Sequence, residues 1–235
     1  MTSPAQMAVI LSCEHATNKV PDQYRPLLAD CLDQLSTHQG YDPGALDFAK
    51  LLAERLSAPL FAGSISRLLV DLNRSLRNRR TPPVKKKCDL TSRQEELLIK
   101  YYLTYRRQID EAIGGYLRQG QTVVHLSIHS FTPILAGVCR TADVGFLYDP
   151  GRLQEKEFCD KWRSALAARD NSWRLRRNYP YRGISDGLVR TLRQKYPAHH
   201  YLGIELEINQ IYPLERTADW LRLQQQLLAS LVAVL

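Results

Sequence analysis

The sequence predicts an α/β fold in which a mostly parallel or mixed sheet has helices on both faces. Short apolar segments rich in β-branched residues alternate along the chain with longer segments that have apolar residues at helical spacing. This order is typical of a parallel sheet with helical crossovers. The clearest strand, residues 123–128, lies between Gly120 and Pro133 and has the composition of a buried strand. At 235 residues, the chain suits a single domain, residues 1–235, with a basic excursion at about 74–91.

The other elements follow from the same two patterns. Strands are expected at residues 7–12, 59–62, 68–72, 123–128, 144–148 and 201–208, and helices at 26–35, 43–56, 92–117, 154–169, 186–196 and 220–234. Asp42 and Pro43 are typical of a helix start, as the N-cap and the first helical residue. Ser92 and Glu95 have the spacing of a capping box at the start of the longest helix. The tyrosines of that helix are expected to face the core.

The composition is that of an ordinary globular protein, with 44% hydrophobic and 24% charged residues. No apolar run approaches the roughly 20 residues that a membrane-spanning helix needs. The first apolar segment has no basic region before it, so we expect no secretory signal. The five cysteines are scattered, and none forms a CxxC pair. This usage favours reduced thiols and a cytoplasmic protein.

The net charge of +8 raises the question of an anionic partner. Much of the excess lies between Arg74 and Lys87, a stretch that contains no acidic residue. Such a stretch is most simply a solvated basic loop, and it also attracts small anionic substrates. No aromatic residue is interleaved with these charges, whereas a base-stacking surface for nucleic acid needs aromatic side chains. We therefore expect a small anionic substrate, and nucleic-acid binding through residues 74–87 is the less favoured alternative.

Polar residues follow three of the predicted strands at the ends where they are expected to meet. Glu14 and His15 follow the first strand, His129 ends the strand that starts at residue 123, and Glu207 lies near the end of the last one. The carboxyl ends of parallel strands share one edge of a sheet, so these side chains are expected to converge. A catalytic zinc ion takes about three such ligands and keeps one position open. His15, His129 and either Asp42 or Glu14 supply this set for one Zn2+ per chain, although Asp42 is equally well explained as a helix cap.

The same residues suggest hydrolysis. Zinc lowers the pKa of a bound water towards ~7, and a nearby carboxylate then takes its proton and passes it to the leaving amine. Glu205 and Glu207 share one face of the last strand, and the terminal one, Glu207, is expected to be this acid/base. An arginine among Arg67, Arg74 and Arg140 is expected to hold a substrate carboxylate by two hydrogen bonds.

Several motifs together resemble the N-formylglutamate amidohydrolase family. They are residues 13–21, 38–45, 67–74, 129–133, 178–181 and 207–209, in the family's order over most of the chain. That family is related in fold to the zinc-dependent exopeptidases, so the resemblance implies a zinc-exopeptidase-like hydrolase fold. It also implies that His15 and His129 bind zinc, that Asn73 and Arg74 bind the substrate and that Glu207 is the acid/base.

Two positions depart from the related patterns. The exopeptidases have a glutamate where this chain has Asn18, which leaves the third ligand as Asp42 or Glu14. The arginine that usually follows the Glu-Ile pair of the family is Asn209 here. The expected function is zinc-dependent removal of an N-formyl group from an acidic amino acid such as N-formyl-L-glutamate. The alternatives are hydrolysis of another small N-acyl compound or peptide, and the nucleic-acid binding named above.

Overall fold

A six-stranded mixed sheet forms the centre of the computed structural model, which describes residues 7–78 and 90–235. Its strands are β1 (Met7–Cys13), β2 (Leu60–Ala62), β3 (Thr122–Phe131), β6 (Val144–Leu147), β7 (Leu175–Arg177) and β8 (Tyr201–Asn209). Their order is β2-β1-β3-β8-β6-β7, and only the β6–β8 pair is antiparallel. The predicted α/β fold with a mostly parallel sheet is confirmed.

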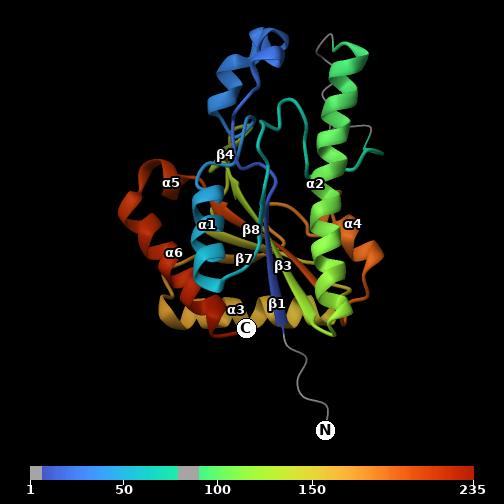
Figure 1. Ribbon diagram of the computed structural model, residues 1–235. Helices are drawn as coiled ribbons and strands as arrows, with labels where there is room; N and C mark the ends of the chain where they lie inside the picture. The colour runs from blue at the N-terminus through green and yellow to red at the C-terminus, as the bar shows by residue number, and fades with distance from the viewer. Residues whose placement is uncertain (1–6, 79–89) are drawn as a thin grey trace.

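Helices cover both faces of the sheet (Figure 1). They are the 3-10 helix η1 (Asp22–Ser36), α1 (Ala45–Leu56), α2 (Ser92–Arg118), α3 (Leu153–Arg169), α4 (Leu188–Lys195), α5 (Ile211–Glu215) and α6 (Thr217–Val232). Helices α1, α3 and α6 share one apolar core with the sheet, and η1, α2 and α4 share the other. A small hairpin, β4 (Ile134–Leu135) and β5 (Val138–Cys139), follows β3.

The two faces of the central strands differ in chemistry. Val124, Leu126 and Ile128 of β3 pack into the core that contains α1, α3 and α6. The alternating residues of β3 face the other way, and three successive ones, His125, Ser127 and His129, are polar. Together with their neighbours on β1 and β8 they form a buried polar column of Ser12, His125, Ser127, His129, Glu205 and Glu207. The functional candidates of the sheet therefore share one face.

The prediction of a strand at residues 68–72 is wrong. This segment is a series of turns with a single bridge at Val70. The Ser66 hydroxyl accepts from the Leu68 amide at 3.2 Å, and the Asp71 carboxylate accepts from the Asn73 amide at 3.0 Å. These local bonds satisfy the backbone groups that a strand would pair with a neighbour, and they point the side chain of Asp71 into the interior.

Three details of the predicted helices are also corrected. The segment predicted as a helix at 26–35 is the 3-10 helix η1, which has a kink at Cys31. Helix α1 begins after Gly44, whose φ of 77° is left-handed, so Asp42 is not its N-cap. The capping box of α2 consists of Thr91 and Gln94, one residue before the predicted pair. The hairpin β4–β5 and the short strand β7 were not predicted.

Some sequence-based expectations concern residues that the structure does not describe. Residues 79–89 of the basic excursion, which include Cys88, lie outside the described residues. The four cysteines within the described ranges, Cys13, Cys31, Cys139 and Cys159, are free thiols. Among the described helices, none combines the length and the apolar character that crossing a membrane requires.

Candidate active site

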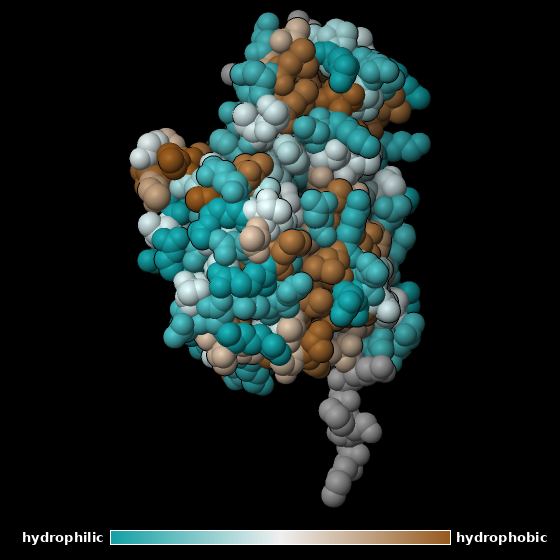
Figure 2. Space-filling view, turned by 90° about the vertical axis from the view of Figure 1, so that its left-hand side faces the viewer, coloured by the Kyte–Doolittle hydropathy of each residue, from teal (hydrophilic) through white to brown (hydrophobic). Residues whose placement is uncertain are grey.

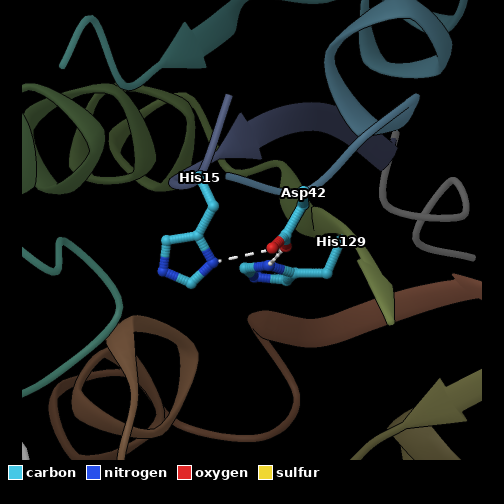
Figure 3. A group of neighbouring side chains, drawn as sticks. All are labelled: His15, Asp42 and His129. Atoms are coloured by element: carbon cyan, nitrogen blue, oxygen red, sulfur yellow. Dashed lines mark hydrogen bonds and ion pairs between the residues drawn. The ribbon is translucent and has the colours of Figure 1, made fainter. Parts of the chain in front are cut away.

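Two histidines and one aspartate converge at the carboxyl edge of the sheet. Asp42 Oδ2 lies 2.8 Å from His129 Nδ1 and 3.3 Å from His15 Nδ1. Figure 3 shows the carboxylate between the two rings. The three ligand atoms lie within 4.8 Å of one another, and all three residues are buried. We call His15, Asp42 and His129 the His-Asp-His cluster.

Each member of the cluster comes from a different element. His15 lies in the turn after β1, Asp42 in the loop before α1, and His129 near the end of β3. The Asp42 amide donates to the His15 carbonyl at 2.9 Å, which ties two of these segments together. The chain bends directly after β1, so that both Glu14 and His15 reach the site although they are adjacent.

The donors of the cluster fit a zinc ion. Two imidazole nitrogens and one carboxylate oxygen are typical ligands of catalytic zinc, and all three residues line a cavity, which leaves room for a further ligand. Buried carboxylates also gather here: Glu14, Asp42, Asp71, Glu205 and Glu207. Burial by itself raises the pKa of Asp42, but His15 and His129 lower it well below its ordinary value. A site with this excess of buried acidic groups favours a bound cation.

Glu14 and Asp71 lie on the outer side of the two rings. Glu14 Oε2 is 2.9 Å from His129 Nε2, and Asp71 Oδ1 is 2.8 Å from His15 Nε2. Neither belongs to the group of atoms that converges on Asp42 Oδ2. Sequence reasoning missed Asp71, although it lies within the motif at residues 67–74.

Glu207 and Glu205 lie beside the cluster on β8. Glu207 is the register partner of His129, and Glu205 is the register partner of Ser127. Burial raises the pKa of Glu207 to about 8, and it also raises the pKa of Glu205. Within the described residues, Glu207 Oε2 has no hydrogen-bond partner. Glu207 is therefore a carboxyl group that lines the cavity and can exchange a proton near neutral pH.

The raised pKa of Glu207 predicts a pH-dependent stability of the metal-free protein. The folded protein holds this proton up to a pH near 8, whereas an unperturbed carboxyl releases it near 4.5. The contribution of Glu207 to the free energy of unfolding is therefore full below pH 4.5 and is lost as the pH rises towards 8. Urea unfolding of chelator-treated wild type and Glu207→Gln should show the wild type losing roughly 3 kcal/mol or more relative to the variant over this range. Parallel stability curves would contradict the assignment.

The predicted substrate-binding residues differ in how many of their side-chain polar groups already have partners within the protein. Arg67 lies between two acids, with Nη2 2.9 Å from Asp71 Oδ2 and Nη1 3.5 Å from Asp42 Oδ1. Arg74 lines the cavity, and its Nη1 donates to the backbone carbonyls of Asn73 at 3.0 Å and Asp186 at 2.9 Å. The Asn73 amide nitrogen lies 3.3 Å from His129 Nε2, and its oxygen accepts from a backbone amide.

Arg140 lies against the aromatic ring of Tyr181, which lines the cavity. Its guanidinium carbon is 5.1 Å from the ring centroid, and Nη1 donates to the Tyr181 hydroxyl at 3.2 Å. Burial, together with the charges of Arg67 and Arg140, lowers the pKa of His38, which also lines the cavity. Tyr181 was not a sequence-based candidate.

The cavity has a volume of about 950 Å³ and extends from the His-Asp-His cluster to η1. Its polar end contains the cluster, Glu207 and Arg74, and its far wall includes Leu27, Leu28 and Cys31 of η1. Figure 2 shows apolar side chains at the top of the molecule, the level at which η1 lies in Figure 1. The cavity therefore joins a charged end to a partly apolar one.

Comparisons with known proteins agree with this fold. The family model for N-formylglutamate amidohydrolase matches residues 7–212. A crystal structure of a gene product from Agrobacterium tumefaciens is similar over 98% of this chain and 92% of its own, with 30% identity and a TM-score of 0.77. The crystal structure of N-formylglutamate amidohydrolase from Ralstonia eutropha is similar in fold over 98% of this chain and 94% of its own, with 19% identity and a TM-score of 0.70. A comparison with curated proteins gave no match. The chain belongs to the N-formylglutamate amidohydrolase family.

Proposed function

We propose that this protein is a zinc-dependent amidohydrolase that removes the formyl group from an acidic N-formyl amino acid such as N-formyl-L-glutamate. The observation that carries the proposal is the buried His-Asp-His cluster at the charged end of a cavity, with Glu207 on the neighbouring strand. His15, Asp42 and His129 would hold the ion. When bound, zinc supplies a Lewis acid that polarises the amide carbonyl and makes water more acidic.

Glu207 supplies the proton transfers of hydrolysis. In its ionised form it takes a proton from the attacking water, and it gives this proton to the amine nitrogen as the C–N bond breaks. The products are formate and the free amino acid. Since no described residue bonds Glu207 Oε2, this oxygen is available for both transfers. A cation at the cluster favours the ionised form of Glu207 that the first transfer needs.

Arginines around the cavity account for an acidic substrate. N-formylglutamate has two carboxylates, and the described residues that line the cavity include three arginines, Arg67, Arg74 and Arg182. Arg74 lines the cavity at its charged end. Arg140 is not among the residues that line the cavity, but its Nη1 donates to the hydroxyl of Tyr181, which is. Arg67, which is paired with two aspartates, is less available for a substrate carboxylate.

A larger N-acyl substrate is the second candidate. Cavities of about 300–1,000 Å³ hold drug-sized ligands, and the cavity of about 950 Å³ lies at the upper end of this range. N-formylglutamate fills only a small part of such a volume. Leu27 and Leu28 of η1 supply an apolar wall that a longer acyl group or a peptide would contact.

The test combines metal content with a substrate panel. We expect the purified protein to bind about one zinc per chain and, when loaded, to release formate from N-formylglutamate. The panel adds N-acetyl and longer N-acyl glutamates, and N-formyl-leucine as the neutral control, which should react more slowly by at least tenfold in kcat/KM. Faster turnover of the longer acyl compounds would select the second candidate. Absence of both zinc binding and amide hydrolysis, with salt-sensitive binding to DNA instead, would contradict the hydrolase and favour the basic stretch.

A further inference from the structure

Each histidine of the cluster has a second carboxylate at the ring nitrogen that faces away from Asp42. We propose that Glu14 and Asp71 are positioning residues, which fix His129 and His15 by their Nε2 atoms so that both rings present Nδ1 to the metal. This inference rests on the metal site proposed above. It also assigns Asp42, and not Glu14, as the third ligand.

His129 carries one carboxylate at each ring nitrogen. Asp42 Oδ2 is 2.8 Å from Nδ1, and Glu14 Oε2 is 2.9 Å from Nε2. Nδ1 is the nitrogen that faces Asp42 within the cluster, whereas Nε2 lies among Glu14, the Ser127 hydroxyl at 2.9 Å and the Asn73 amide nitrogen at 3.3 Å. Glu14 thus holds the side of the ring opposite Asp42, and it fixes the direction in which Nδ1 faces the cluster.

Glu14 is itself held by groups that leave it little freedom. The Ser127 hydroxyl donates to Oε2 at 2.6 Å, and the Tyr105 hydroxyl donates to Oε1 at 3.2 Å. Its side chain is fully buried, behind the ring of His129 as seen from Asp42. A carboxylate whose two oxygens both accept hydrogen bonds is suited to orient a metal-binding histidine, and not to bind the metal itself.

Asp71 repeats the arrangement on the other ring. Asp71 Oδ1 lies 2.8 Å from His15 Nε2, while Asp42 Oδ2 lies 3.3 Å from His15 Nδ1. Arg67 Nη2 holds the second oxygen of Asp71 at 2.9 Å. The turn at residues 66–73, where a strand was predicted, is what places this carboxylate. Arg67 therefore supports the site both through Asp71 and through its own contact with Asp42 at 3.5 Å.

The expected effect is on metal affinity. Partners that hold the second nitrogen of a ligating histidine typically contribute 10-fold to 100-fold to metal affinity. Zinc affinity is measured on the full chain by competition with a chelator of known affinity. We expect Glu14→Gln and Asp71→Asn each to weaken zinc binding by about 10-fold to 100-fold. Asp42→Asn, which alters a ligand, should weaken it more than either.

Glu155→Gln is the matched control. Glu155 is also fully buried and paired with an arginine, Arg193, but it does not line the cavity. Its loss should lower the melting temperature and leave zinc affinity within about twofold. Should Glu14→Gln fail to fold, Tyr105→Phe is the second variant, because it removes the bond to Glu14 Oε1, keeps the aromatic ring and should weaken zinc binding by a few-fold.

A structural readout separates positioning from simple loss of stability. Nitrogen-15 NMR of histidine-labelled, zinc-loaded protein should show a hydrogen on Nε2 and the metal on Nδ1 for both His15 and His129. Coordination through either Nε2, zinc bound by Glu14, or unchanged affinity in Glu14→Gln and Asp71→Asn would overturn this inference while leaving the hydrolase intact. A wild type that binds no zinc at all would overturn the proposed metal site as well.

Discussion

His129→Ala is expected to lose both the bound metal and the amide hydrolysis. The substitution removes one of the three ligand atoms of the cluster, and it leaves Asp42 and Glu14 buried without the ring between them. A metal supplies several kcal/mol of transition-state stabilisation, and each 1.4 kcal/mol is about tenfold in rate. We therefore expect kcat/KM to fall by roughly 1,000-fold or more. Metal analysis and formate release on the same preparations measure the two losses together.

His125→Ala is the control for this experiment. His125 lies on the same strand and face, is fully buried, and bonds the hydroxyls of Ser12 and Tyr201 at 2.8 and 2.7 Å. Burial lowers its pKa to about 4, so it is a neutral structural histidine outside the cluster. Its loss should cost stability, on the order of 1–3 kcal/mol for the unpaired hydroxyls, and the variant should keep its zinc. A His129→Ala protein that keeps both zinc and activity would contradict the site.

The pattern of apolar residues predicts an element correctly only where the backbone has no competing local hydrogen bonds. Residues 123–128 form a strand because their β-branched and apolar residues suit a central parallel strand buried on both sides. Residues 68–72 have a similar composition and form turns instead. The difference depends on the hydroxyl of Ser66 and the carboxylate of Asp71, which bond the local backbone. Such competition is not visible in apolar periodicity.

In the candidate site, too, some residues could be predicted from the sequence and others could not. His15, His129 and Glu207 could be predicted to lie together because each follows or ends a predicted strand, and parallel strands bring their ends together. For Asp42 the sequence left two explanations, cap and ligand, and only the position of Gly44 at the helix start separates them. The alternation of His125, Ser127 and His129 with apolar residues was a signal of a polar face. The contact of Asp71 with His15 depends on tertiary structure and had no such signal.

Glu207→Gln is expected to retain zinc and to lower kcat by about 100-fold to 10,000-fold, the usual contribution of a general acid/base. Glutamine has nearly the same shape, but it neither takes a proton from water nor delivers one to the amine. Because substrate binding depends on the arginines, KM should change little. Wild-type kcat/KM should rise with pH as Glu207 ionises, and this limb should disappear in the variant. The midpoint should lie below the pKa of about 8 to which burial raises Glu207, since a bound cation favours the ionised form.

Glu205→Gln is the matched comparison, because both glutamates are buried, line the cavity and lie two residues apart on β8. Glu205 is the register partner of Ser127, one step further from the end of the strand, whereas Glu207 is the partner of His129, a proposed ligand. If Glu207 moves the proton, its loss should reduce kcat at least tenfold more than the loss of Glu205 and should alone remove the rising limb of the pH profile. The reverse order of effects would transfer the acid/base role to Glu205 and leave Glu207 as a buried acid that only sets the charge of the site.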